Sequence, residues 1–342
     1  MNMTDLKTLF YKRFSSVNKH LGAISTGLPI SLLGYIHTDR ISTISTCVSP
    51  DIKMLASKTE DFYITFTSTR TDKRRRYSIL NPTGDDKISR FIQAYMPENG
   101  GEILVDSSIP PSFDQNIPYT AAAIMSVINL QSKKQKPCEP LDFLKDGHNA
   151  YQTVFNHKHG YATHIFSTGI NSLPLPLSLH KILVIDTLNK SARLNNIGAL
   201  FFKIQRVYPN IGSFSDLTED MVNKLQLSDR DRLLSLHLIY ENKLIYEGAK
   251  ALKAVNLSDF SQIVNRSFLS QKKILPPSDS RVFVCDTLLE TAGVLCARVD
   301  NCGALAIVKD EYCNFAANQI RATFLGRFGF APVICITDTH AL

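Results

Sequence analysis

One stretch near the start of the chain, Thr26–Arg40, constrains fold and function more than any other segment. It reads T-G-L-P-I-S-L-L-G-Y-I-H-T-D-R: an apolar run that ends at Gly34, followed by a short polar end that contains His37 and Asp39. No charged residue precedes His37 within it. The sequence leaves two interpretations of His37 and Asp39 open. They hydrogen-bond a polyol ligand, or they belong to a turn that Asx-type hydrogen bonds stabilise.

The composition indicates a folded protein with more than one domain. The chain has 342 residues, of which 44% are hydrophobic, enough for one large core or two ordinary ones. Helical and strand-like patterns both occur, so we predict the α+β class. We place the domain boundary near residue 180, which gives domains 1–180 and 181–342.

The charge balance does not favour nucleic acid as a partner. The 38 basic and 31 acidic residues give a formal net charge of +7, which is mild for this length. The densest basic run, Arg70 to Arg76, follows the strand-like segment Phe62–Phe66. We predict that this run lies at a solvated hairpin tip, with an anion or nucleic-acid patch as the alternative. We expect no nucleic-acid partner.

The seven cysteines indicate a reducing environment. They include no Cys-x-x-Cys pair, and most lie in apolar runs, as Cys285 and Cys335 do, where cysteine behaves as a small hydrophobic residue. Their odd number, with the lack of a signal peptide and of a long apolar span, predicts a cytoplasmic protein with no membrane partner.

The apolar periodicity predicts helices and strands in both halves of the chain. A short amphipathic helix is expected over residues 4–14, and Ser228 is a good N-cap for a long helix that continues toward Leu252. The C-terminal region is predicted to run strand, helix, strand, helix, strand. Its elements are the strand Val282–Cys285, the helix 287–292, the strand 304–308, the helix 311–325 and the strand 333–337.

The stretch Thr26–Arg40 resembles the opening motif of the galactokinase family, P-G-R-V-N-L-I-G-E-H-T-D-Y. The apolar spacing, Gly34 and the His-Thr-Asp end are kept. Pro29 stands at the arginine of the motif, and Tyr35 and Ile36 stand where one glutamate is expected. The apolar frame of the motif is therefore kept, while two of its charged groups are missing.

Further segments resemble galactokinase motifs in the same order along nearly the whole chain. They are Gly101–Pro110, His237–Asn242 (which matches H-x-x-x-E-N), Ala249–Ala254, Ala297–Val308 (which stands at R-M-T-G-G-G-F-G-G-C-T-V) and the tail with Phe328–Pro332. The resemblance implies the two-domain architecture of the GHMP small-molecule kinases, in which sugar and nucleotide bind in an inter-domain cleft.

The phosphate loop of the family, P-x-G-x-G-L-S-S-S-A-A, is matched by Pro110–Ala122, which contains no glycine. A phosphate loop needs bare backbone N–H groups at a helix N-terminus. Asp114 adds negative charge, Pro118 removes a donor, and Phe113 and Tyr119 are bulky where close approach is required. The resemblance therefore implies no cofactor-binding residue and no ATP bound in the family manner.

The catalytic pair of the family is an aspartate in G-I-M-D-Q, which orients or deprotonates the sugar hydroxyl, and the arginine of the opening motif. The matching stretch, Gly160–His164, places Thr163 at the aspartate, and Pro29 stands at the arginine. A threonine hydroxyl, which is not ionised near neutral pH, cannot replace the base. The resemblance therefore implies no catalytic residue.

His37 and Asp39 remain as the substrate-binding candidates. The sugar site of the family also uses the glutamate of the opening motif and a tyrosine in S-x-x-Y-N. The glutamate is missing, and the tyrosine maps near Arg193 or Leu194. The resemblance thus leaves His37 and Asp39 for a small sugar ligand, beside the turn interpretation given above.

Three histidines have a spacing that could hold a metal ion. His157, His159 and His164 form the pattern H-x-H-x4-H. The surrounding sequence is loop-like, and no cysteine or carboxylate stands beside them. We predict unrelated surface histidines and no metal site.

Two functional hypotheses follow. The first is a galactokinase-like pseudokinase that acts by binding a sugar-like ligand or a protein partner, and this hypothesis includes a scaffold with no ligand. The alternative is an active sugar kinase with divergent motifs, which would require ATP and Mg²⁺. The two differ in one structural respect, because an active enzyme needs a carboxylate and a cation facing each other beside an open phosphate loop.

Overall fold

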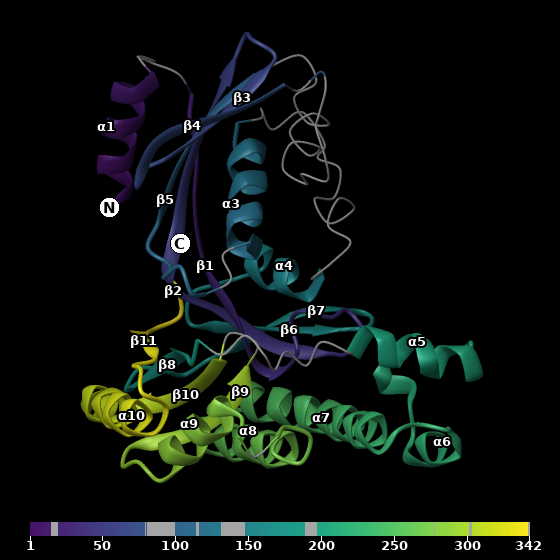
Figure 1. The fold of residues 1–342 in the computed structure, drawn as a ribbon. Coiled ribbons are helices and arrows are strands. Elements are labelled where there is room, and N and C mark those ends of the chain that lie inside the picture. Colours follow the sequence, from purple (N-terminus) through teal and green to yellow (C-terminus); the bar gives the residue numbers. More distant parts are fainter. Residues whose placement is uncertain are drawn as a thin grey trace.

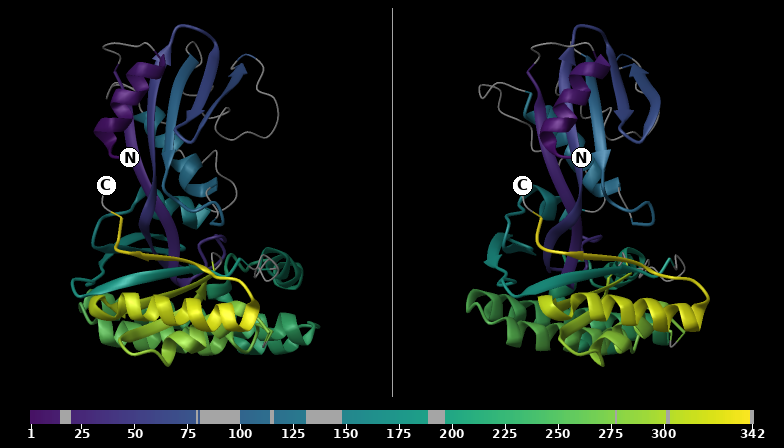
Figure 2. Two further views of the ribbon diagram at one scale, coloured as in Figure 1. Left: turned by 60° about the vertical axis from the view of Figure 1, so that its left-hand side comes forward. Right: turned by 90° about the vertical axis from the view of Figure 1, so that its left-hand side faces the viewer.

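The computed structural model describes residues 1–14, 20–78, 80, 100–113, 116–130, 148–188, 197–276, 278–300 and 303–340. Figure 1 shows two parts, one above the other. The upper part holds a sheet between α1 (Met3–Phe14) and α3 (Asn116–Ile128), and the lower part holds a second sheet with the C-terminal helices below it. Figure 2 shows these helices as a layer at the base of the molecule.

The first sheet has the strand order β4-β3-β5-β2-β6-β7, and β1 also pairs with β2. Its pairs are antiparallel except for β3 and β5, which run parallel. The long strands β1 and β2 extend from the upper part into the lower part (Figure 1). The strands are β1 (Gly22–Gly34), β2 (Thr43–Thr59), β3 (Tyr63–Ser68), β4 (Thr71–Ser78), β5 (Gly100–Ser107), β6 (Tyr161–Phe166) and β7 (Gly169–Pro174).

The second sheet is antiparallel, with the order β11-β8-β10-β9. The first sheet ends at Pro174 and the second begins at His180, but the domain boundary near residue 180 stays a prediction. The strands are β8 (His180–Asp186), β9 (Val294–Asp300), β10 (Gly303–Lys309) and β11 (Val333–Thr337).

The remaining helices lie mostly in the second half of the chain. Within the described residues, no helix is both long and apolar enough to cross a membrane. The helices are α4 (His148–Phe155), α5 (Ile197–Val207), η2 (Phe214–Asp216), α6 (Glu219–Lys224), α7 (Asp229–Lys253), α8 (Leu257–Gln271), α9 (Ser280–Leu289), η3 (Asp310–Tyr312) and α10 (Cys313–Phe328).

One hydrophobic core joins the two sheets. It contains Leu33 and Ile44 of the first sheet, Ile182 of the second and Leu244 of α7. At Gly248 of α7 a Cβ atom would lie 2.6 Å from the Leu33 Cδ1 atom, so the missing side chain lets α7 pack closely against β1. The end of β1 near Gly34, where the loop with His37 and Asp39 begins, is therefore closely packed against α7.

The helix-start signals predict α7 correctly. The side chain of Ser228 accepts a hydrogen bond from the Asp231 backbone N–H at 3.2 Å, and the helix continues to Lys253. The predicted strand Val282–Cys285 is wrong, because these residues lie inside α9. The Asp279 side chain caps that helix by accepting a hydrogen bond from the Arg281 N–H at 2.9 Å. The C-terminal region therefore has a helix and a β9–β10 hairpin before α10.

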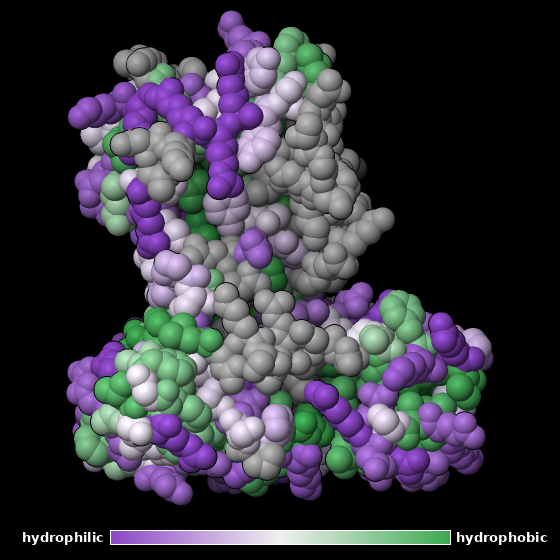
Figure 3. Space-filling view, in the orientation of Figure 1, coloured by the Kyte–Doolittle hydropathy of each residue, from purple (hydrophilic) through white to green (hydrophobic). Residues whose placement is uncertain are grey.

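The predicted solvated hairpin is formed by β3 and β4, with Arg70 exposed in the turn between them, but Arg74–Arg76 lie along β4 rather than at the tip. Arg74 donates a hydrogen bond to the Arg13 carbonyl at the C-terminal end of α1 at 3.0 Å. Arg76 pairs with Asp61 at 2.8 Å and lies 3.9 Å from the centre of the Tyr63 ring. Figure 3 shows long hydrophilic side chains over this upper part of the molecule. Two of the arginines thus stabilise the strand and α1.

Candidate functional site

The loop after β1, which contains His37 and Asp39, is held from two sides. Asn149 of α4 donates both amide hydrogens to it, to the Thr38 carbonyl at 2.6 Å and to the Ile41 carbonyl at 3.0 Å. On the other side, the Phe214 N–H donates to the Arg40 carbonyl at 2.9 Å. The loop therefore has a fixed conformation between α4 and η2.

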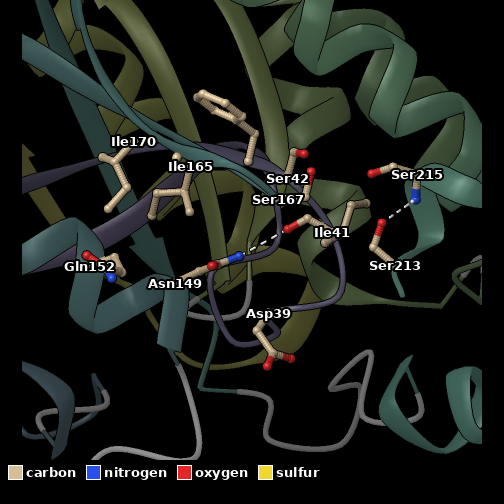
Figure 4. A pocket seen from close by; sticks show the side chains of 12 residues that line it. Asp39, Ile41, Ser42, Asn149, Gln152, Ile165, Ser167, Ile170, Ser213 and Ser215 are labelled. Carbon is tan, nitrogen blue, oxygen red and sulfur yellow. Dashed lines mark hydrogen bonds between the residues drawn. The ribbon is translucent and has the colours of Figure 1, made fainter. Parts of the chain in front are cut away.

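A pocket of about 390 Å³ opens beside this loop. Its volume falls in the range of about 300–1,000 Å³ that is typical of small-molecule sites. Figure 4 shows Asp39 between Asn149 on one side and Ser213 on the other, with Ile165 and Ile170 near the β6–β7 turn. The lining residues are Asp39, Ile41, Ser42, Asn149, Gln152, Ile165, Phe166, Ser167, Gly169, Ile170, Ser213 and Ser215.

The structure separates the two predicted substrate-binding residues. Asp39 lines the pocket with its carboxylate half exposed, and Arg40 lies 3.4 Å from it. His37 is half-buried and is not among the described residues that line the pocket. Sequence reasoning missed Gln152 and Ser215, which α4 and η2 bring to the same cavity.

Tyr35, one of the two residues that stand where the family has one glutamate, belongs to a buried network and does not line the pocket. Its hydroxyl lies 2.6 Å from His237 Nε2 and accepts a hydrogen bond from Gln271 Nε2 at 3.2 Å. Burial raises the pKa of Tyr35 far above its ordinary value and lowers the pKa of His237 to about 4. Both side chains are therefore neutral near pH 7, and Tyr35 is unavailable to a ligand in the pocket.

Glu241 and Arg298 form an ion pair that holds the end of β1. Their side chains are fully buried and lie 3.2 Å apart. Glu241 accepts hydrogen bonds from the Gly34 N–H and from the Ser267 hydroxyl, each at 2.7 Å, and Arg298 donates to the Gly34 carbonyl at 3.1 Å. Burial would raise the pKa of Glu241, but Arg298, His237 and these hydrogen bonds together hold it below its ordinary value. These motif residues thus fix the backbone from which the Asp39 loop begins.

The positions that match the catalytic arginine and aspartate of the family lie on either side of β2. Pro29 of β1 pairs with Cys47, and Thr163 of β6 pairs with Ser45. Directly paired strand residues project to one face of a sheet, and so do residues two apart on a strand. Pro29 and Thr163 therefore share a face, as the chemistry of the family requires, but neither carries a charge.

The surroundings of Thr163 are closed. Its side chain is buried, with 2% of its surface exposed. The Ser45 hydroxyl lies 2.7 Å from the Thr153 hydroxyl of α4 and 3.3 Å from the Thr163 carbonyl, to which it donates. Uncharged hydroxyl groups covered by α4 thus occupy the place where the family has a base.

The segment that matches the phosphate loop is only partly described, because Asp114 and Gln115 lie outside the described residues. Phe113 is buried in the main core, with 3% of its surface exposed. Pro118 lies in the first turn of α3, and its carbonyl accepts a hydrogen bond from the Thr26 hydroxyl at 3.0 Å. The first turn of α3 is therefore tied to β1, and proline leaves it one N–H donor fewer.

The prediction that these histidines lie at the surface is wrong for His157 and His164, which are buried, whereas His159 is exposed. His157 accepts a hydrogen bond from the Cys47 N–H at 3.4 Å, and its Nε2 lies 2.8 Å from the His340 carbonyl. His159 contacts the Thr339 carbonyl at 3.1 Å. The histidines 157 and 159 thus hold the C-terminal tail against β2.

Burial lowers the pKa of His164 to about 4. Within the described part of the chain, no group of three or more His, Cys, Asp or Glu residues is arranged to hold a metal ion.

Two curated galactokinases are similar to the chain in sequence. That of Clostridium acetobutylicum is 25% identical over 180 residues, which cover 48% of this chain and 46% of that protein. That of Clostridium perfringens strain SM101 is 31% identical over 134 residues, which cover 36% and 34%. The matched segments thus span about a third to a half of the relatives' length. No protein-family model matches the chain.

The structural comparisons cover nearly the whole chain. A crystal structure of Lactococcus lactis galactokinase complexed with galactose matches with a TM-score of 0.81, over 98% of each chain at 16% identity. Mevalonate kinase from Methanococcus jannaschii matches with a TM-score of 0.61, over 95% of this chain and 99% of that one. The fold is therefore that of the GHMP small-molecule kinases.

Within that class the relation is to galactokinases, as the order of the motifs predicted. The fold and the sequence similarity agree, because both relate the chain to galactokinases.

Proposed function

We propose that this galactokinase-family chain is a pseudokinase that binds a sugar-like ligand in the Asp39 pocket and transfers no phosphoryl group. One observation carries the proposal. Pro29 and Thr163 lie on one face of the sheet, on the two strands that flank β2, yet neither supplies a charge. Because the two matched positions share one face of the sheet on either side of β2, a misaligned motif is a poor explanation for the loss.

The described residues at the phosphate-loop position do not fit a triphosphate. Phosphate binding at a helix start depends on free backbone N–H groups and close approach. Pro118 has no N–H, and Phe113 fills part of the core before α3. We therefore propose that neither ATP nor Mg²⁺ is bound in the family manner.

The alternative is an active sugar kinase, and one observation favours it. Asp39 and Arg40 place a carboxylate and a guanidinium 3.4 Å apart at the pocket. Arg40, however, stacks 5.0 Å from the centre of the Phe201 ring, on the side of α5. The two charges therefore face each other rather than a substrate hydroxyl between them.

The proposal also includes a cytoplasmic location. The five cysteines in the described part of the chain are free, which suits a reducing compartment. A protein partner is the second mode of action that the proposal allows.

A paired measurement tests the proposed function. The full chain is titrated by calorimetry with a panel of neutral hexoses, and ADP formation is followed in the presence of Mg-ATP and the same sugars. We expect at least one hexose to bind while ADP formation stays at the rate of the buffer. Sugar-dependent ADP formation that Asp39→Asn abolishes would establish the alternative. If no hexose binds, the partner-binding scaffold is the surviving version.

A further inference from the structure

The charges at the Asp39 pocket limit the kind of ligand it can take. Among the described lining residues, Asp39 is the one with a formal charge, and none is lysine, arginine or histidine. The neighbouring Arg40 donates to the Gly212 carbonyl at 3.5 Å and stacks on Phe201. Phosphate esters are bound by cations and clustered N–H donors. The lining therefore disfavours a sugar phosphate.

The hydrogen-bond donors of Asn149 are already used. Its two amide hydrogens go to the Thr38 and Ile41 carbonyls, so only its carbonyl oxygen is left for a ligand. Asp39 lines the same pocket (Figure 4) and offers acceptors alone when ionised. This end of the pocket therefore requires a ligand group that donates several hydrogen bonds.

The opposite side of the pocket continues this pattern at Ser215. Its hydroxyl hydrogen goes to the Asn242 side-chain oxygen at 3.3 Å, so toward a ligand the hydroxyl is an acceptor. Gln152 differs, because its side-chain oxygen accepts from Asn156 at 2.9 Å and its amide hydrogens have no partner within the described part of the chain. The pocket can thus hold a hydroxyl-bearing ligand with its most donor-rich group at Asp39.

Ile165, Phe166 and Ile170 supply an apolar wall at the β6–β7 turn. The ring of a pyranose sugar has an apolar C–H face that can pack against such a wall. An ammonium group carries three donors and no acceptor, which suits the Asp39 and Asn149 oxygens.

We infer that the ligand of this pocket is an unphosphorylated amino sugar, whose ammonium group is bound by Asp39 and whose ring packs on Ile165 and Phe166. This inference rests on the proposed function, since it names the class of sugar that the same pocket takes. The exposed ion pair between Asp39 and Arg40 does not prevent Asp39 from binding an ammonium group instead, because exposed ion pairs contribute little stability.

The experiment compares four probes on the full chain by calorimetry at pH 6: galactose, galactosamine, N-acetylgalactosamine and galactose 1-phosphate. Galactosamine is expected to bind about tenfold more tightly than galactose, because hydrogen bonds between charged partners are stronger than neutral ones. N-acetylgalactosamine keeps the nitrogen but loses the charge, so it should bind no better than galactose. Galactose 1-phosphate should bind weakest.

Variants assign the preference to Asp39. Asp39→Asn keeps the shape of the side chain and should reduce the advantage of galactosamine over galactose to within about twofold, while galactose still binds. Asp220→Asn, at an exposed acid in the first turn of α6, is the matched control and should keep the full preference.

The outcomes separate the inference from the proposed function. Equal binding of galactose and galactosamine, or tighter binding of galactose 1-phosphate, would overturn the inference and leave a sugar-binding pseudokinase. Retention of the preference in Asp39→Asn would overturn it as well. Failure of all four probes would contradict the inference together with the sugar-binding version of the function.

Discussion

Glu241 of α7 and Arg298 of β9 form a fully buried ion pair, and the pair holds both backbone polar groups of Gly34. The same glycine ends the apolar run of the opening motif, 207 residues from Glu241 in the sequence. These residues of the family-like motif segments therefore have a structural role that does not depend on catalysis. They fix the end of β1, and through it the loop that carries Asp39.

Removing one partner of this pair should destabilise the protein strongly. Glu241→Gln leaves the Arg298 charge buried and uncompensated, which is expected to reduce the free energy of unfolding by about 3–5 kcal/mol. Chemical denaturation at pH 7 measures it. The exposed pair of Glu219 and Lys243, 3.9 Å apart, supplies the control, since Glu219→Gln should change stability by less than about 1 kcal/mol. Equal effects of the two variants would contradict a structural role for the buried pair.

The buried histidines should make the protein less stable in mild acid. Burial lowers the pKa of His237 and of His164 to about 4, whereas an unfolded histidine titrates near about 6.5. Between these values the unfolded chain binds protons that the folded chain does not, so stability falls as the pH decreases from about 6.5 to about 4. The contribution of each histidine is fully present above about pH 6.5.

His164→Phe tests this prediction, because His164 packs 5.0 Å from the Phe166 ring and its ring nitrogens have no hydrogen-bond partner among the described residues. Between pH 6 and pH 5 the free energy of unfolding should fall less steeply in the variant than in the wild type, by up to about 1.4 kcal/mol per pH unit. Unfolding measured at pH 8, where both side chains are uncharged, gives the effect of the ring exchange alone. An unchanged slope would show that His164 is protonated in the folded state.

The Thr163 site should not accept the missing carboxylate. Thr163→Asp places an acid at a position with 2% of its surface exposed, among the hydroxyl groups of Ser45 and Thr153. We expect a loss of about 3 kcal/mol or more in stability, or a rise in the pKa of the new acid, and no ADP formation. Thr163→Val is the control for size, and it should be much less destabilising. A Thr163→Asp variant as stable as Thr163→Val, with the pKa of the new acid in its ordinary range, would contradict this prediction.

The C-terminal tail should stabilise the first sheet through His157. His157→Ala removes the partner of the Cys47 N–H and of the His340 carbonyl, both in buried surroundings. The expected loss is about 1–3 kcal/mol. His159→Ala removes contacts that are only half-buried and should cost less. If the two variants melt at the same temperature, the buried contacts of His157 contribute no more stability than the contacts of His159.

The sequence predicts the fold better than the site for physical reasons that particular residues show. Ser228 predicts the start of α7 correctly, because an N-cap hydrogen bond joins residues within one turn of the helix and so can be recognised from local sequence. The segment Val282–Cys285 is predicted as a strand because its valines favour strands. It is helical because the Asp279 side chain before it caps the start of α9. Gln152 and Ser215 could not be assigned to one pocket, since they come together only because α4 and η2 each hold the Asp39 loop, from opposite sides.

Asn149 should affect ligand binding mainly by holding the loop that shapes the pocket, rather than by contacting the ligand directly. Asn149→Ala removes both hydrogen bonds to the loop carbonyls of Thr38 and Ile41, so the loop should sample other conformations before a ligand binds. We expect sugar affinity to fall about tenfold and trypsin to cleave faster after Arg40, even without ligand. Gln152→Ala is the matched control, since Gln152 lines the pocket but holds no part of the loop, and it should weaken binding without changing cleavage. If Asn149→Ala weakens binding while cleavage after Arg40 stays slow, Asn149 acts as a direct ligand contact and the loop is held by Phe214 alone.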